Sequence, residues 1–264
     1  MKPFYFRDSG KSLFGIYHPP SSHRARKCGI VICHPIGHEY IHGYRALRQL
    51  ANQLARAGFA VLRFDYYGCG DSAGDAIQAT LLQWLNDVHA AIDEIRSRAH
   101  VSKIGLIGAR LGATLSLLVG SERSDVDATV LWDPVVNGKR YIAGLIAQHH
   151  EWLDERPTRL RAGEADKQVL EVLGFPINAA LREGIERLDL LMLNRVPVKR
   201  VLTLEGDKTD RGVQLSEHLK AAGAESDYQH VAASRVWLRK QGGDNVVVPV
   251  QILQAIVNWT SRIT

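Results

Sequence analysis

The sequence predicts an α/β protein with a mostly parallel central sheet flanked by helices. Short runs rich in β-branched and apolar residues alternate with stretches in which leucine and alanine recur at helical spacing. Strands separated by helices run parallel, because each crossover returns the chain to the same end of the sheet. The 264 residues, of which 45% are hydrophobic and 23% charged, are enough to bury the core of one large domain.

The first half of the chain holds most of the predicted sheet. The run CGIVIC at 28–33 is typical of a buried strand, and YRALRQLANQLARA at 44–57 is typical of a helix. Gly58 stands where a glycine commonly ends a helix. The other strands of this half are expected at 13–17, 59–64, 104–107 and 128–132, and the other helices at 81–99 and 111–119.

The alternation of strands and helices stops between Val135 and Asn194. This segment is rich in Arg, Glu, Leu and Ala and is broken at Pro157, Gly174 and Pro176. We predict a helical cap inserted at 135–194 into a core formed by 1–134 and 195–264. In the returning part of the core we expect a strand at 198–204, a helix at 212–222, an extended run at 226–231 and an amphipathic helix at 249–263.

Composition excludes several classes of protein. Arg7, Asp8 and Lys11 interrupt the N-terminal region where a signal peptide needs an apolar run, so a cytoplasmic protein is expected. The apolar runs are shorter than the roughly 18 to 20 residues of a membrane span. These short runs predict no membrane span. The net charge of +5 is spread over both halves, so we also predict no nucleic-acid partner.

The cysteines and histidines give no metal or disulfide pattern. Three cysteines are an odd number and lack a CxxC spacing, which argues against a disulfide framework and a zinc site. The histidines, His149 and His150 of the insertion included, lack the spacing of metal ligands. We therefore predict neither a metal nor a cofactor.

The segment Gly108-Ala-Arg-Leu-Gly112 follows a predicted strand and opens a predicted helix. Its two glycines allow a strand and a helix to approach closely around a sharp turn. The central residue is Arg110, whose guanidinium has a pKa above about 12 and no lone pair with which to attack a carbonyl. Two interpretations stay open: Arg110 clamps a carboxylate or phosphate of a ligand, or it pairs with a neighbouring carboxylate and fills the turn.

This segment resembles the G-x-S-x-G nucleophile elbow of the α/β-hydrolase superfamily. More narrowly, FDYYGCGDSAG at 64–74, RLGA at 110–113 and WDPVVNG at 132–138 resemble the exosortase A system-associated hydrolases of the serine aminopeptidase-like branch, which are found with exopolysaccharide loci. The resemblance implies an α/β-hydrolase fold over most of the chain and arginine at the elbow as a trait of the group. It implies a hydrolase by fold, without a defined substrate.

The run HPIGHEY at 34–40 stands where the hydrolases place an oxyanion-hole loop. Backbone N–H groups there would face a developing negative charge or a bound anion. His38 and Glu39 are the side chains of this run that are expected to reach the pocket. The predicted ligand-binding residues are Ile36, Gly37, His38, Arg110 and Leu111.

Several acids are candidates for the third member of a triad. Asp207 and Asp210 lie in the turn after the strand at 201–204, and Asp133 follows the strand that ends at Trp132. The position at the carboxyl end of a strand favours Asp133 and Asp207. The triad histidine is expected between 232 and 248, where the sequence contains none, and His230 is expected to be a strand residue.

The loop DYYGCGDSAG contains Cys69, Asp71 and Ser72, which resemble a nucleophile with an acid. We interpret them as structural, because such glycine-rich loops use Asp and Ser to hydrogen-bond local backbone.

Two functions follow. In the first, the protein is a catalytically degenerate α/β hydrolase that binds an anionic or acyl small molecule, or a partner in exopolysaccharide production, with Arg110 as anchor. The alternative is an active ester or thioester hydrolase or acyltransferase in which His38 or His34 activates water and Arg110 stabilises charge. The candidate catalytic residues are Arg110, Asp133, Asp207 and His38. A second copy of the chain, in a homodimer, is the other candidate partner.

Overall fold

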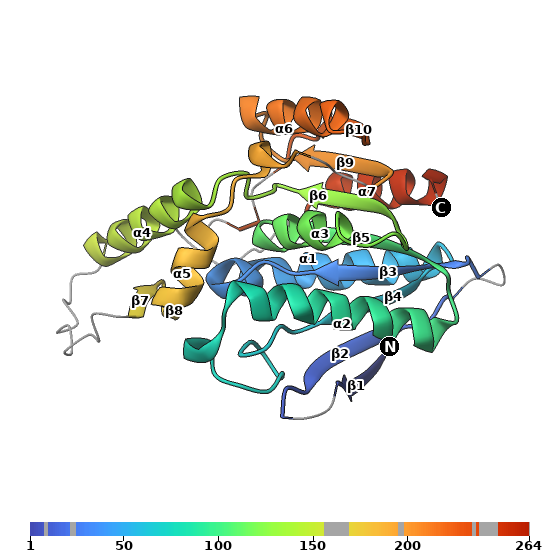
Figure 1. Ribbon diagram of the computed structural model, residues 1–264, viewed down its shortest axis with the longest axis horizontal. Coiled ribbons are helices and arrows are strands. Elements are labelled where there is room, and N and C mark those ends of the chain that lie inside the picture. Colours follow the sequence, from blue (N-terminus) through green and yellow to red (C-terminus); the bar gives the residue numbers. More distant parts are fainter. Residues whose placement is uncertain are drawn as a thin grey trace.

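The computed structural model describes residues 1–7, 10–21, 25–155, 169–194, 198–233, 236–237 and 248–263. Within these residues an 8-stranded sheet has the order β1-β2-β4-β3-β5-β6-β9-β10 (Figure 1). Helices cover both of its faces, so the predicted α/β class is confirmed. None of the helices in the described part of the chain combines the length and the apolar character that crossing a bilayer requires.

The elements of the sheet and its covering helices follow the predicted order closely. The strands are β1 (Lys2–Phe6), β2 (Leu13–His18), β3 (Cys28–Cys33), β4 (Ala60–Phe64), β5 (Lys103–Ala109), β6 (Val126–Trp132), β9 (Arg200–Glu205) and β10 (Glu225–His230). The helices are α1 (Gly37–Arg56), α2 (Leu81–Ala99), α3 (Leu111–Gly120), α6 (Asp210–Ala221) and α7 (Val250–Ile263).

The sheet is parallel from β4 to β10 and antiparallel at its β1 end. β3 pairs in parallel with β4 and β5, β5 with β6, β6 with β9, and β9 with β10. β1 pairs antiparallel with β2, and β2 antiparallel with β4. β1 was not predicted from the sequence. A short connection without a crossover helix joins it to β2, so the two strands run in opposite directions.

The core fills both faces of the sheet. Every residue of β3 is buried, as its unbroken apolar run predicts. On one face α1 and α7 pack against the strands through Leu47, Leu50, Leu54, Ile252, Leu253 and Ile256. On the other face α2 and α3 contribute Val88, Ile92, Ile95, Leu111, Leu115 and Val119. This packing fixes the strand ends that carry the site.

The predicted helical cap also contains strands. The segment comprises α4 (Gly138–Asp154), the antiparallel hairpin β7 (Val169–Val172) and β8 (Phe175–Asn178), α5 (Ala179–Glu186) and the 3₁₀ turn η2 (Leu190–Met192). The hairpin corrects the expectation of an all-helical insertion. Its two central turn residues, Leu173 and Gly174, both have positive φ, as a type I′ hairpin turn requires.

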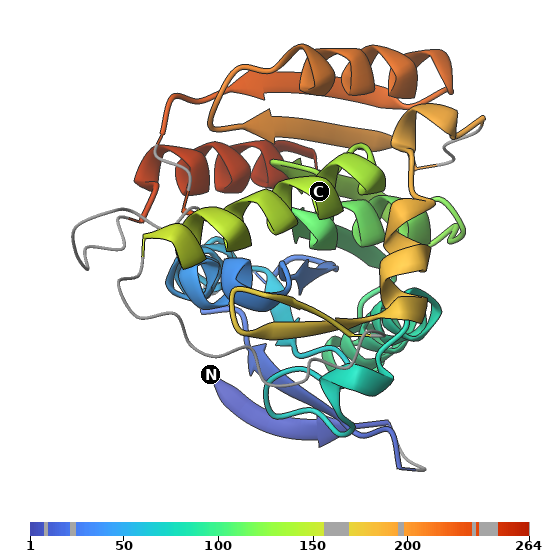
Figure 2. The ribbon, with the colours of Figure 1, turned by 90° about the vertical axis from the view of Figure 1, so that its left-hand side faces the viewer.

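These elements lie beyond the carboxyl ends of the parallel strands (Figure 1) and extend across that end of the sheet when it is viewed directly (Figure 2). The division into a core of 1–134 and 195–264 and an insertion of 135–194 stays a prediction. Pro157, one of the breaks that suggested it, lies outside the described residues.

Candidate functional site

Arg110 lies at the sharp turn between β5 and α3, with φ of 54° and ψ of −124°. The glycines on either side make this turn sterically feasible. A Cβ at Gly108 would collide with backbone atoms of Gly112 and Ala113. A Cβ at Gly112 would collide with the carbonyl oxygens of Cys33, the last residue of β3, and of His34, which follows it. The elbow geometry expected from the sequence is therefore present, with a guanidinium at its centre.

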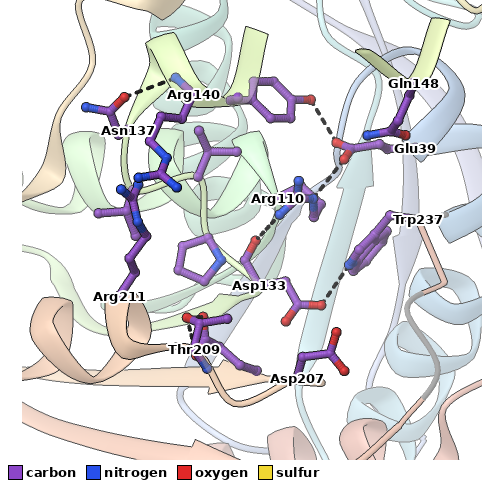
Figure 3. Close-up of a pocket in the computed structure, with 15 residues that line it drawn as sticks. Glu39, Arg110, Asp133, Asn137, Arg140, Gln148, Asp207, Thr209, Arg211 and Trp237 are labelled. Atoms are coloured by element: carbon purple, nitrogen blue, oxygen red, sulfur yellow. Dashed lines mark hydrogen bonds and ion pairs between the residues drawn. The ribbon is translucent and has the colours of Figure 1, made fainter. Parts of the chain in front are cut away.

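The guanidinium of Arg110 is held by two partners. Its Nε donates to Glu39 Oε1 at 2.8 Å, and its Nη1 donates to the backbone carbonyl of Asp133 at 3.0 Å (Figure 3). The second oxygen of Glu39 accepts a hydrogen bond of 2.8 Å from the Tyr141 hydroxyl. Of the two interpretations of Arg110, the structure therefore agrees with pairing to a neighbouring carboxylate.

This ion pair is largely removed from water. Glu39 is 2% exposed, and the side chain of Arg110 is 24% exposed. Burial opposes the charge of Arg110, but the charges and hydrogen bonds of Glu39, with the nearby Tyr141 and Asp133, raise its pKa above the ordinary value. Burial and the charge of Glu39 raise the pKa of Tyr141, so its hydroxyl stays neutral and donates. The centre of the elbow is thus a cation held against its own counter-ion.

A cavity of about 280 Å³ opens beside this pair. It lies at the carboxyl ends of β5, β6 and β9, where the sequence analysis placed the site. Its walls come from the elbow, the first turn of α1, the segment after β6, α4, the turn after β9, the first turn of α6 and Trp237. The charged residues that line it are Glu39, Arg110, Asp133, Arg140, Glu205, Asp207 and Arg211.

Asp133 and Asp207 both line this cavity, whereas Asp210 begins α6 and is not among the lining residues. Both carboxylate oxygens of Asp133 accept hydrogen bonds: Oδ1 from the Gly206 N–H at 2.9 Å, and Oδ2 from Trp237 Nε1 at 2.8 Å (Figure 3). Asp133 itself has a positive φ of 45°. Its contacts hold the turn after β9 and Trp237 against the end of β6.

Glu205 was not predicted as a site residue from the sequence. This residue is 6% exposed, and its carboxylate accepts from the hydroxyls of Thr209 and Tyr228. Burial, with the charge of Asp133, raises the pKa of Glu205. Glu205 ends β9, so its position at the carboxyl end of a strand, the criterion that favoured Asp133, was a usable signal.

The predicted loop at 34–40 is largely helix. α1 begins at Gly37, so His38 and Glu39 belong to its first turn, where a negative side chain is favoured by the helix dipole. Ile36, Gly37 and His38 line a second cavity of about 220 Å³, and Arg110 does not. Leu111 is fully buried in the core. The predicted ligand-binding set is thus divided between two cavities and the core.

The second cavity is mostly apolar. Its walls come from the start of α1, the glycine-rich loop after β4, Trp84 of α2, and the cap segment through Leu145, Val172, Phe175, Ile177 and Leu181. His38 is 7% exposed, and burial lowers its pKa despite the adjacent Glu39, so the ring is neutral near pH 7. Its Nε2 has no hydrogen-bond partner in the described part of the chain.

His34 lies away from both of these cavities. Its Nδ1 lies 2.6 Å from the carbonyl of Pro35, and its Nε2 lies 3.8 Å from Asp65 Oδ1. Burial lowers the pKa of His34, although Asp65 acts in the opposite direction. His34 is not among the residues that line the cavity of Arg110.

The contacts of the loop after β4 agree with its structural interpretation. The Ser72 hydroxyl donates to the backbone carbonyl of Asp65 at 2.6 Å, and the N–H of Asp71 donates to the Asp65 carboxylate at 3.1 Å. Burial raises the pKa of the Cys69 thiol to about 12, so the thiolate is scarce at neutral pH. His230 is a residue of β10, as expected.

Comparison with known proteins gives a match to a family model and a match to one relative over part of the chain. Residues 26–171 match the family model described as serine aminopeptidase, S33. Over 78 residues the chain is 35% identical to the mitochondrial palmitoyl-protein thioesterase ABHD10 of Homo sapiens and of Pongo abelii. That alignment covers 30% of this chain and 24% of each relative.

Solved structures share the fold at low sequence identity. Est1E from Butyrivibrio proteoclasticus with bound ferulic acid superposes with a TM-score of 0.72 at 17% identity, covering 98% of both chains. Mouse α/β hydrolase domain-containing protein 10 superposes with a TM-score of 0.63 at 16% identity, covering 100% of both chains. These likenesses extend the agreement in fold to nearly the whole chain.

Proposed function

We propose that the chain, which belongs to the serine aminopeptidase S33 family of α/β hydrolases, is a catalytically degenerate member of that family. In this proposal the cavity beside Arg110 binds an anionic or acyl small molecule without forming a covalent intermediate. The observation that carries the proposal is the ion pair of Arg110 with Glu39, which fills the elbow.

A serine triad needs a nucleophile, a base that removes its proton and donors that stabilise the oxyanion. Arg110 has no lone pair to offer a carbonyl carbon. Two of its donor atoms, Nε and Nη1, already bond Glu39 and the Asp133 carbonyl. The residue at the elbow therefore provides a fixed positive charge, and it provides no atom that could attack a carbonyl carbon.

The positions of the other triad members support the same proposal. The carboxylate of Asp133 is engaged by the Gly206 N–H and by Trp237. The sequence between 232 and 248 contains no histidine. Part of that stretch, residues 234–235 and 238–247, lies outside the described residues, so this argument rests on the sequence alone.

Turnover of p-nitrophenyl esters and acyl thioesters tests the proposal. We expect the parent protein, Arg110→Ala and Arg110→Ser to match the rate in buffer, and a fluorophosphonate probe to leave the parent unlabelled. Robust turnover by the parent that is lost in Arg110→Ala would overturn the degeneracy. Labelling of any serine, located by peptide mass spectrometry, would also overturn it.

The likeness to a palmitoyl-protein thioesterase favours a second candidate, an active ester or thioester hydrolase or acyltransferase of non-standard mechanism. It requires His38 or His34 to activate water while Arg110 stabilises negative charge. His38 lines the apolar cavity and Arg110 the polar one, which weakens this candidate. Thioester turnover abolished by His38→Gln, with the fold intact, would establish it.

The connection with exopolysaccharide production is proposed from the sequence motifs at 64–74, 110–113 and 132–138. Deleting the gene and measuring the yield of exopolysaccharide tests it. An unchanged yield and chain length would remove this part of the proposal.

A further inference from the structure

Two arginines besides Arg110 line the polar cavity. Arg140 belongs to the first turn of α4, and Arg211 to the first turn of α6. Figure 3 shows the two guanidinium groups directed toward the same part of the cavity, although their helices follow different strands of the sheet. Two like charges aimed at one space repel each other, so the arrangement favours an anion between them.

Neither of these arginines has a carboxylate partner in the described part of the chain, in contrast to Arg110, which Glu39 neutralises. The cavity's own acids do not fill that role. Asp133 bonds Gly206 and Trp237, and Glu205 bonds Thr209 and Tyr228.

Asp207 lies at the other end of the cavity in Figure 3, on the side of Trp237. Asp207 is thus separated from Arg140 and Arg211. The end formed by Arg140 and Arg211 is the positive one.

One amide group at each helix start bonds the side chain that caps the helix. Asn137 Oδ1 accepts from the Arg140 N–H at 3.1 Å, and Thr209 Oγ1 accepts from the Gly212 N–H at 3.1 Å. A guanidinium carries a full charge and two parallel donors, so these side chains would dominate recognition of an anion here, with the positive ends of the helix dipoles adding to their field.

We propose that Arg140 and Arg211 clamp a doubly charged oxyanion, namely the phosphate of a monoester or a diphosphate group. A guanidinium binds phosphate through two parallel N–H bonds, and a dianion balances both arginines, whereas a single carboxylate balances one. The inference rests on the proposed function and deepens it, because it assigns the anion to these two residues instead of Arg110. The 280 Å³ cavity leaves room for the rest of a small ligand, which would extend from the phosphate toward Trp237.

Isothermal titration with pyrophosphate, inorganic phosphate and acetate at constant ionic strength tests the clamp. We expect pyrophosphate and phosphate to bind the parent more tightly than acetate. Arg140→Gln and Arg211→Gln should each weaken pyrophosphate binding about tenfold, the value of one lost charge-assisted contact, and the double variant should show no measurable binding. Arg45→Gln removes an exposed arginine of α1 outside the cavity and should leave the affinity unchanged.

Pyrophosphate binding at parental affinity by the double variant would overturn the clamp, as would a parent that binds no phosphate compound at millimolar concentration. Acetate binding as tight as that of phosphate would overturn the requirement for a dianion. Ester turnover by the parent would refute the degeneracy and leave the clamp standing, so the two proposals fail separately.

Discussion

Arg110 and Glu39 are 71 positions apart in the sequence, and they form an ion pair with an Nε–Oε1 distance of 2.8 Å. Glu39 comes from the first turn of α1 and Arg110 from the turn between β5 and α3. Tyr141 of α4 bonds the same carboxylate. Three separate elements are therefore joined through one buried carboxyl group, which makes Glu39 the most informative residue to change.

We expect Glu39→Gln to lower the free energy of unfolding by about 3 kcal/mol. The substitution removes the counter-ion of a mostly buried guanidinium, and an uncompensated buried charge is strongly destabilising. Urea unfolding followed by circular dichroism measures the loss. The matched control, Glu183→Gln, breaks the exposed pair with Arg187 and should cost less than about 1 kcal/mol. Equal losses in the two variants would contradict the importance of the buried pair.

A double variant separates this charge effect from packing. With Glu39→Gln already present, we expect Arg110→Met to cost much less than it does in the parent, since the unpaired charge is then removed. The sum of the losses of unfolding free energy in the two single variants should therefore exceed the loss in the double variant by more than about 1 kcal/mol. Strict additivity in urea unfolding would show that the two side chains act independently.

Gly138 and Gly144 of α4 should respond oppositely to alanine. A Cβ at Gly138 would collide with the carbonyl oxygen of Ile185 in α5, whereas a Cβ at Gly144 meets nothing within 4 Å. We expect Gly138→Ala to lower the melting temperature because the two helices must separate. Gly144→Ala should stabilise the protein by about 0.5 to 1 kcal/mol through helix propensity. Thermal unfolding of both variants decides the matter, and a stable Gly138→Ala would contradict this packing.

Stability should fall in mild acid, and His18 should account for part of the fall. Burial and the charge of Arg63 lower the pKa of His18 from 6.5 to about 4. Between these values the unfolded chain binds a proton that the folded chain does not, so the free energy of unfolding decreases as the pH falls. The decrease from this group approaches about 3 kcal/mol at pH 4.

Urea unfolding between pH 7 and pH 4.5 measures this slope. Burial also lowers the pKa of His34 and of His38, so these two act in the same direction. His18→Gln should therefore reduce the slope without abolishing it. A variant with the parental slope would show that His18 is protonated equally in both states.

The three cysteine thiols should be unreactive in the native protein. Burial raises the pKa of Cys28, Cys33 and Cys69 to about 12 in each case. The thiolate is then about one part in ten thousand at pH 8, and the thiolate is the reactive form. Titration with Ellman's reagent should detect no prompt thiol before unfolding and 3 thiols in guanidinium chloride. Prompt labelling that Cys69→Ala removes would show that the apolar cavity activates this thiol.

Local sequence pattern was sufficient for most of the sheet and its covering helices. The strand at Cys28–Cys33 and the helix at Leu81–Ala99 have the predicted bounds. Thr80 caps that helix by accepting from the Gln83 N–H, a signal that the sequence displays. Elements of this kind are specified by residues close together in the chain.

The elements that were missed depend on pairing between segments. β1 is stabilised by its register with β2, and the strands of the β7–β8 hairpin have only four residues each. Short strands have too few positions for a reliable alternation of apolar and polar residues. The early start of α1 was missed because the segment GHEYIHG at 37–43, which precedes the apolar repeat, contains two glycines and three polar residues.

The position of the site in the fold was predicted from the sequence, but the contacts between its side chains were not. The elbow, Arg110 and the strand end at Asp133 follow from strand and helix order. The choice of Glu39 as the counter-ion does not, because several carboxylates reach the same edge of the sheet. The separation of His38 and Arg110 into different cavities likewise depends on the placement of α1 and α4.

Steric restrictions at the elbow apply to the two glycines and not to the side chain of the residue between them. Gly108 and Gly112 are dictated by backbone atoms that would occupy the place of any larger residue, while the guanidinium between them extends into a space that accepts a long polar group. Architecture and reactivity are therefore separable at this bend. Under the proposed degeneracy, this chain keeps the frame of an enzyme and exchanges the one atom that reacts, so a search based on the glycines finds proteins that a search based on the serine discards.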